Sequence, residues 1–203
     1  MRRGWVVTAV ISVALGVACA YGGAAEPKEQ QDKAAPAPTV NSVADQALRD
    51  AALEGRLDLV AAAVDQGACI DAQDTDGRTA LMYAAFNGHT ECVRWLLERE
   101  AAVGAREYVG RTALMFASSG PFPETAKLLL DFGSNPNDAD EYEGWTPLMF
   151  AAAEGRLEVI RALLDYGASP SAVDKDGDVA ADHAASNRHS EVEGVLREAQ
   201  MAP

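Results

Sequence analysis

One phrase recurs along this chain: threonine, then alanine or proline, then Leu-Met, an aromatic residue and alanine. It begins at Thr79, Thr112 and Thr146, so its copies start 33 and 34 residues apart. A nearly fixed period of this length is typical of proteins in which one supersecondary unit is copied and each copy buries its apolar face against the next. The phrase therefore predicts a stack of similar units, which presents an extended surface rather than a closed catalytic pocket.

Apolar periodicity predicts two helices in each unit. In the fourth copy, Leu148, Ala151 and Ala152 form one helical stripe, and a second stripe containing Ile160 and Leu163 comes after it. Spacings of three and four residues place such side chains on one helix face. Between copies, Asp-x-Asp-Gly sequences are typical of turns. Each unit is expected to be a helix, a turn, a second helix and an extended finger.

The repeated phrase and its surroundings resemble the ankyrin repeat, whose pattern is D-x-x-G-x-T-P-L-H-x-A-A-x-x-G-H-x-E-V-V-x-L-L-L-x-x-G-A-x-x-N. The resemblance implies an all-α repeat solenoid of helix-turn-helix units with β-turn fingers, in about five copies. The outer two copies are degenerate and are expected to act as caps, the last of them with a polar final helix. The copies occupy residues 41–73, 74–106, 107–140, 141–173 and 174–200 of a domain spanning 43–200.

Departures from the family pattern carry their own predictions. The usual histidine of the phrase is replaced by Met82, Met115 and Met149, which are expected to pack through their thioethers in the core. Glu100 stands where glycine follows the second helix of other copies, so a left-handed residue there would be strained by roughly 1 kcal/mol. Pro121-Phe122-Pro123 replaces a Gly-His step, and we expect this turn to differ in shape from its neighbours.

The first residues have the layout of a secretory signal. Arg2 and Arg3 precede an uncharged apolar run over 5–17, and small residues lie around Cys19. Three outcomes stay open: cleavage after Ala20, lipid attachment at Cys19 in a sequence that resembles a bacterial lipoprotein box, or retention as a membrane anchor. All three predict export, to the periplasm or as an outer-membrane lipoprotein of a Gram-negative-type bacterium. Residues 1–20 are assigned to this signal.

A proline-containing segment without apolar periodicity comes after the signal. Residues 21–42 contain Pro27, Pro36 and Pro38 among alanine, glutamine and charged residues. Such a composition is typical of a flexible linker. It would hold the repeats away from a membrane if Cys19 or an uncleaved signal provides a tether.

The chain is strongly acidic. Its formal net charge is −14, which becomes −16 if Arg2 and Arg3 are removed with a signal. An acidic surface repels nucleic acid and anionic lipid headgroups, so neither is expected as a partner. It favours basic partners, or serves only to keep an exported protein soluble.

Residues that could support chemistry are explained by the repeat. His89 and His189 occupy the family's Gly-His step, no histidine pair has metal-ligand spacing, and phosphate-loop, zincin and nucleophile-elbow motifs are absent from the sequence. The acidic segments 138–143 and 174–178 lack the glycine placement of a calcium-binding loop. We therefore predict no catalytic residues, no metal and no cofactor.

The two cysteines inside the repeats are placed at different levels of the stack. Cys69 follows the end of one second helix and Cys92 lies near the start of the next, which is too far apart for a disulfide. Cys92 occupies an apolar position of the pattern and is expected in the core. A thiol-redox or calcium-dependent sensor or enzyme built on Cys69 or the acidic loops stays as an alternative of another class.

The family resemblance implies where a partner would bind. Ankyrin domains usually bind through finger tips and inner-helix ends, on their concave face, and these positions predict non-catalytic recognition of a protein of unknown identity. A narrower alternative is an inhibitor or immunity-type protein that occludes an exported enzyme. Tyr108 and Tyr142 are expected at equivalent positions one repeat apart. The predicted partner-binding residues are Arg78, Phe86, Asn87, Tyr108, Arg111, Tyr142, Glu143 and Trp145.

Overall fold

The computed structural model describes residues 42–201. This part of the chain contains every copy of the recurring threonine phrase. The predicted signal, the lipid-attachment residue Cys19 and the linker up to residue 41 lie outside the described residues.

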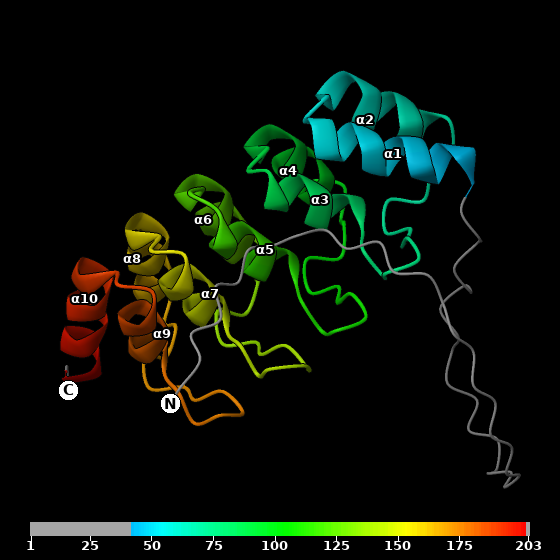
Figure 1. Ribbon diagram of the computed structural model, residues 1–203. Coiled ribbons are helices and arrows are strands. Elements are labelled where there is room, and N and C mark those ends of the chain that lie inside the picture. Colours follow the sequence, from blue (N-terminus) through cyan, green and yellow to red (C-terminus); the bar gives the residue numbers. More distant parts are fainter. Residues whose placement is uncertain (1–41, 202–203) are drawn as a thin grey trace, which may run out of the picture. The chain divides into compact units, whose positions relative to one another are not determined.

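Helices account for most of residues 42–201 and come in five antiparallel pairs (Figure 1). The odd-numbered helices contact one another in sequence and form an inner row, while the even-numbered helices form an outer row. Extended segments between pairs all project on the side of the inner row. Apart from an isolated antiparallel bridge between Val173 and Val179, the described chain contains no strand pairing. The helices are α1 (Val43–Glu54), α2 (Leu57–Asp65), α3 (Ala80–Phe86), α4 (Thr90–Leu97), α5 (Ala113–Ser119), α6 (Pro123–Asp131), α7 (Pro147–Ala153), α8 (Leu157–Asp165), α9 (Ala180–Ser186) and α10 (Ser190–Met201).

The threonine that opens the recurring phrase ends the extended segment and caps an inner helix. The Thr79 and Thr146 hydroxyls each accept a hydrogen bond from the N–H three residues on, at 3.4 Å. Thr112 has the same extended backbone but makes no side-chain cap bond. Proline at the first position of α6 and α7 is tolerated because its missing N–H would have no partner within the helix.

Small and flexible side chains fill the space between inner helices. Met82, Met115 and Met149 are 2%, 1% and 0% exposed, which confirms that methionine packs where the family pattern has histidine. Apart from Ala153, the alanines of α3, α5 and α7 are almost fully buried, and their size lets neighbouring helices approach closely. The core is therefore continuous from α1 to α10 rather than divided between repeats.

Two non-glycine residues have left-handed backbone. Glu100 has φ 62°, while Gly67, Gly133 and Gly167 at equivalent positions have φ 91°, 92° and 83°. The predicted strain at Glu100 thus has a structural basis. Arg188, between α9 and α10, has φ 64° and was not predicted.

The turn between α5 and α6 differs from its neighbours, as the proline pair predicted. Gly120 has extended backbone (φ −100°, ψ 170°), whereas Gly88 in the preceding repeat has φ 69°. Phe122 lies so close to Gly88 that a Cβ there would be 2.2 Å from its ring. The phenylalanine therefore packs the α5–α6 turn against the α3–α4 turn.

Candidate functional site

Each finger is closed by the same backbone hydrogen bond. The N–H of an acidic residue donates to the carbonyl of the residue four positions on in three of the four fingers, and five positions on in the other, at 3.0 Å in every case. We name these turns by repeat: the second (74–78), third (107–111), fourth (140–145) and fifth (174–178) fingers. The fourth finger is thus one residue longer than the rest.

The hydrogen bonds correct two predictions made from the sequence. The third copy was placed at 107–140, but Asp140 begins the fourth finger rather than ending the third copy. Tyr108 N–H donates to the Asp76 carbonyl at 3.0 Å, and Glu141 N–H donates to the Val109 carbonyl at 2.9 Å. Glu141, not Tyr142, is therefore the equivalent of Tyr108. Tyr108 and Tyr142 lie equally far before Thr112 and Thr146, which made them look equivalent. The additional residue of the fourth finger shifts this register by one.

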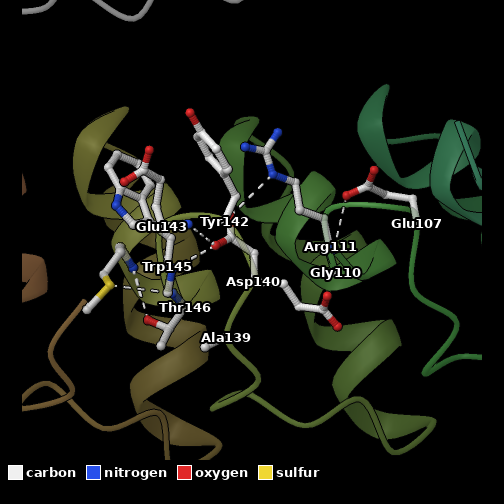
Figure 2. A network of polar contacts seen from close by, with 12 residues as sticks. Glu107, Gly110, Arg111, Ala139, Asp140, Tyr142, Glu143, Trp145 and Thr146 are labelled. Atoms are coloured by element: carbon white, nitrogen blue, oxygen red, sulfur yellow. Dashed lines mark hydrogen bonds and ion pairs between the residues drawn. The ribbon is translucent and has the colours of Figure 1, made fainter. Parts of the chain in front are cut away.

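Asp140 organises the fourth finger (Figure 2). One carboxylate oxygen accepts hydrogen bonds from the N–H groups of Glu143, Gly144 and Trp145 at 2.9, 2.8 and 3.2 Å. The other lies 3.4 Å from Nε of Arg111, which reaches across from the third finger. The Asp140 side chain is 0% exposed, so its charge is compensated almost entirely by these groups.

The second and fifth fingers use their carboxylates differently. Asp74 accepts a hydrogen bond from the Tyr83 hydroxyl at 2.6 Å, and Asp174 lies 2.8 Å from Nε2 of His183, at the same position of the inner helix. Burial alone would raise the pKa of Asp74, but the Tyr83 hydroxyl and the Arg78 N–H outweigh it, and the pKa is lowered. These two fingers are therefore tied to their own inner helices.

Phenylalanine occupies that inner-helix position in the third and fourth repeats and contributes to an aromatic row. Phe86 meets Phe116 edge to face, with ring centroids 6.2 Å apart. The Arg111 guanidinium lies 5.2 Å from the centroid of Phe150, and Phe150 is 5.2 Å from Trp145. We call Phe86, Phe116, Phe150 and Trp145 the aromatic row, and the surface made by this row and the fingers the finger face.

The predicted binding residues differ in how freely they could meet a partner. Tyr108 and Tyr142 are 70% and 67% exposed, and the Tyr142 ring points away from the polar network in Figure 2. Phe86 is 41% exposed. By contrast, Trp145 is partly buried and packs 4.4 Å from His183, so much of its ring serves the fold.

The remaining predicted residues are engaged by the protein. Asn87 donates from its side chain to the carbonyl of Leu53 in the preceding repeat at 2.7 Å. Arg78 forms an ion pair with Asp76 at 3.4 Å. The Glu143 N–H belongs to the Asp140 network, and its carbonyl accepts from Lys175 N–H. Asn87 therefore joins repeats, whereas Arg78 and Glu143 keep partly exposed side chains on the finger face.

The groups considered for a sensor are tied to the fold or lie apart from one another. Asp138 in the first acidic segment pairs with Arg106 at 2.8 Å, and Asp174 in the second bonds His183. Within residues 42–201, no cluster of three or more His, Cys, Asp or Glu could hold a metal ion. Cys69 is exposed and Cys92 buried, and neither forms a disulfide. Burial raises the pKa of Cys92, which disfavours its thiolate.

Sequence reasoning missed Phe116, Phe150 and Asp140. The two phenylalanines belong to the recurring phrase itself. The same position holds Tyr83 in the second repeat and His183 in the fifth, and this variation could have indicated a functional position. The role of Asp140 depends on Arg111 from another finger, a contact that local sequence does not specify.

Stacked helix pairs with projecting fingers define a helical repeat protein that offers an extended face for binding. A family model described as ankyrin repeats (3 copies) matches residues 48–140 and 120–200. The chain belongs to the ankyrin-repeat family. Ankyrin repeats are generally protein–protein interaction modules and are typically non-catalytic. A search among curated proteins found no match. Within the described residues, no helix is both long and apolar enough to cross a membrane.

Proposed function

We propose that this chain recognises a protein partner through the finger face without catalysing a reaction. The observation that carries the proposal is the aromatic row, which runs over α3, α5 and α7 beside the exposed tyrosines of the third and fourth fingers. Aromatic and arginine side chains that are partly exposed and held in place by neighbours are typical of binding hot spots. Arg111 is held in this way by Asp140 and Phe150.

Rigidity also supports this face as the binding surface. Consecutive fingers are joined by backbone hydrogen bonds, of which the last runs from Lys175 N–H to the Glu143 carbonyl at 2.9 Å. Side chains on such a framework lose little conformational freedom on binding, which reduces the entropic cost of association. The third and fourth fingers therefore present Tyr108 and Tyr142 on a fixed backbone.

A matched pair of phenylalanines tests the proposal. Phe86 on α3 and Phe132 at the end of α6 are both 41% exposed, but only Phe86 belongs to the aromatic row. Peptides would be selected from a random display library on the immobilised full chain, and their dissociation constants measured for Phe86→Ser and Phe132→Ser. We expect Phe86→Ser to weaken binding about tenfold or more, as truncation of a hot-spot aromatic does, and Phe132→Ser to leave it within about twofold. Equal effects, or a larger effect at Phe132, would refute the proposal.

We also propose that the chain is exported, to the periplasm or as an outer-membrane lipoprotein of a Gram-negative-type bacterium. The support is the charged start, apolar run and small residues of 2–20. Mass spectrometry of the mature N-terminus separates the outcomes: an intact chain indicates an anchor, a lipid mass that disappears in Cys19→Ala indicates a lipoprotein, and a start at Tyr21 indicates cleavage after Ala20. Recovery of intact chain in the cytoplasmic fraction would contradict export.

A further inference from the structure

On the finger face, the arginine side chains have partners within the protein, whereas several carboxylates do not. The side chains of Glu141, Glu143, Asp176 and Asp178 make no ion pair or hydrogen bond with any described residue, although their backbones take part in the finger turns. All but the partly exposed Glu143 are exposed. The fourth and fifth fingers thus carry four carboxylates with which no described side chain pairs.

The basic groups of the same face are already engaged. Arg78 pairs with Asp76, and Arg111 pairs with the buried Asp140. Lys175 lies among the free carboxylates, yet its ammonium donates to backbone carbonyls, including that of Tyr142 at 2.9 Å. Lys175 keeps its positive charge on these carbonyls, but the four free carboxylates outnumber it. The field at the fourth and fifth fingers therefore favours positive charge.

Aromatic groups adjoin these carboxylates. Tyr142 stands between Glu141 and Glu143 in the chain and is 67% exposed. A guanidinium or ammonium group can lie over an aromatic ring while hydrogen bonding to a neighbouring carboxylate, and the two interactions reinforce each other. The aromatic row supplies apolar area next to this charged part. A partner segment with an apolar side chain followed by basic side chains is complementary to the aromatic row and to these carboxylates.

We infer that the finger face takes a basic protein segment, with an apolar or aromatic anchor on Phe86 and Phe116 and arginine or lysine side chains on the carboxylates of the fourth and fifth fingers. This rests on the proposed function, because it specifies the partner of the same face. Acidic segments are excluded by repulsion from the four free carboxylates, and the net charge of −14 acts in the same direction at longer range.

Two variants of equal net charge test the inference. The finger variant combines Glu141→Gln, Glu143→Gln, Asp176→Asn and Asp178→Asn. The control combines Glu91→Gln, Glu98→Gln, Asp165→Asn and Glu191→Gln, which neutralises four exposed acids on or beside outer helices. The probes are the peptides selected on the full chain, measured by titration from about 50 to 300 mM salt, a range over which screening grows markedly.

We expect the selected peptides to carry net positive charge beside an apolar residue. The finger variant should bind them about tenfold or more weakly with a flatter salt dependence, while the control variant stays within about twofold of the unmodified chain. Neutral or acidic peptides, or equal losses in the two variants, would overturn the inference. If Phe86→Ser abolishes binding but the finger variant does not, the finger face still binds and only the basic partner is wrong. If neither change affects binding, the proposed function fails as well.

Discussion

The second and fifth fingers differ from the third and fourth in what their inner helices offer them. Tyr83 and His183 bond to the carboxylates of the second and fifth fingers, whereas Phe116 and Phe150 at the same position have no polar group to do so. In the fourth finger the carboxylate instead meets Arg111 from the neighbouring finger.

The difference shows that the same finger backbone can be bonded to its own inner helix or can leave an aromatic side chain on the surface. Where a hydroxyl or an imidazole satisfies the finger, the polar bond lies within one repeat and the aromatic side chain is used for stability. Where phenylalanine takes its place, the inner helix offers no such bond: the Glu107 carboxylate accepts from Arg111 N–H within the third finger, and only Asp140 of the fourth finger pairs with a side chain of another repeat. Phe116 and Phe150 instead join a row with Phe86 and Trp145. The middle of the finger face is therefore apolar and partly exposed, and the Arg111–Asp140 pair links the third finger to the fourth.

The largest difference in stability between fingers is expected on substituting two glycines, one in the third finger and one in the fifth. Gly110 and Gly177 have φ 84° and 85°, but a Cβ at Gly110 would lie 2.8 Å from the backbone nitrogen of Glu141, while nothing lies within 4 Å at Gly177. Gly110→Ala should lose about 3 kcal/mol of unfolding free energy, from left-handed strain plus the clash, and Gly177→Ala about 1 kcal/mol. Urea unfolding of the full chain measures both, and equal losses would show that the third and fourth fingers are not closely packed.

Removal of the finger carboxylate should rank the fingers by how many groups depend on it. Asp140→Ala leaves three backbone N–H groups and Arg111 without their acceptor, and we expect a loss of about 2 to 3 kcal/mol. Asp174→Ala affects two N–H groups and His183, with a loss nearer 2 kcal/mol. Urea unfolding checks the order. A smaller loss at Asp140 than at Asp174 would contradict the bridging role of its network.

Tyr83→Phe gives the second finger the side chain of the middle fingers. The variant should lose about 1 kcal/mol at pH 7 through the lost bond to Asp74. Because the pKa of folded Asp74 is lowered, its stabilisation is fully present above the unfolded value near 3.9 and is lost as pH falls through the folded pKa. The cost of Tyr83→Phe should therefore shrink below about pH 4. Unfolding measured at pH 7 and below pH 4 tests this.

Tyr108→Phe is the control for this prediction. Its hydroxyl belongs to a 70% exposed side chain and makes no hydrogen bond with the described residues, so the stability should stay within about 0.5 kcal/mol. A cost of Tyr83→Phe that does not depend on pH would indicate that packing, not the bond to Asp74, is lost.

The smallest effect is expected where the fingers are joined to the outer helices. Glu100→Gly should gain up to about 1 kcal/mol, because glycine adopts φ 62° without the strain of a side chain. Glu98→Gly, at a right-handed position with φ −63°, should instead lose about 0.5 to 1 kcal/mol. Thermal unfolding compares the two, and a loss in both would refute the assignment of strain to Glu100.

Features that depend on local sequence were predictable. The helix pairs follow from apolar spacing, the buried methionines from their place in the threonine phrase, and the left-handed Glu100 from its alignment with glycines. The distorted turn at Phe122 follows from its two prolines. In each case the residue and the few positions around it contain the physical cause.

Features that depend on contacts between repeats could not be predicted from the sequence. Asp140 was assigned to the end of the third copy and Tyr142 was matched with Tyr108, because only the pairing of Glu141 with Val109 reveals the register. Asn87 and Trp145 are predicted to meet a partner, and their contacts within the chain, Asn87 with the preceding repeat and Trp145 with Phe150 and His183, were not predicted. Their residue types suit binding and packing equally well, and only the neighbours decide between the two.

Two tryptophans report most directly on which face binds. Trp145 lies on the finger face, and Trp95 lies on outer helix α4 with the Arg99 guanidinium 3.6 Å from its ring centroid. A selected peptide would be titrated into the isotope-labelled full chain while the indole N–H signals of both residues are monitored by NMR, each assigned by substitution with phenylalanine. The finger-face account predicts that the Trp145 signal shifts at saturation and the Trp95 signal stays in place. A shift of Trp95 with Trp145 unmoved would contradict it.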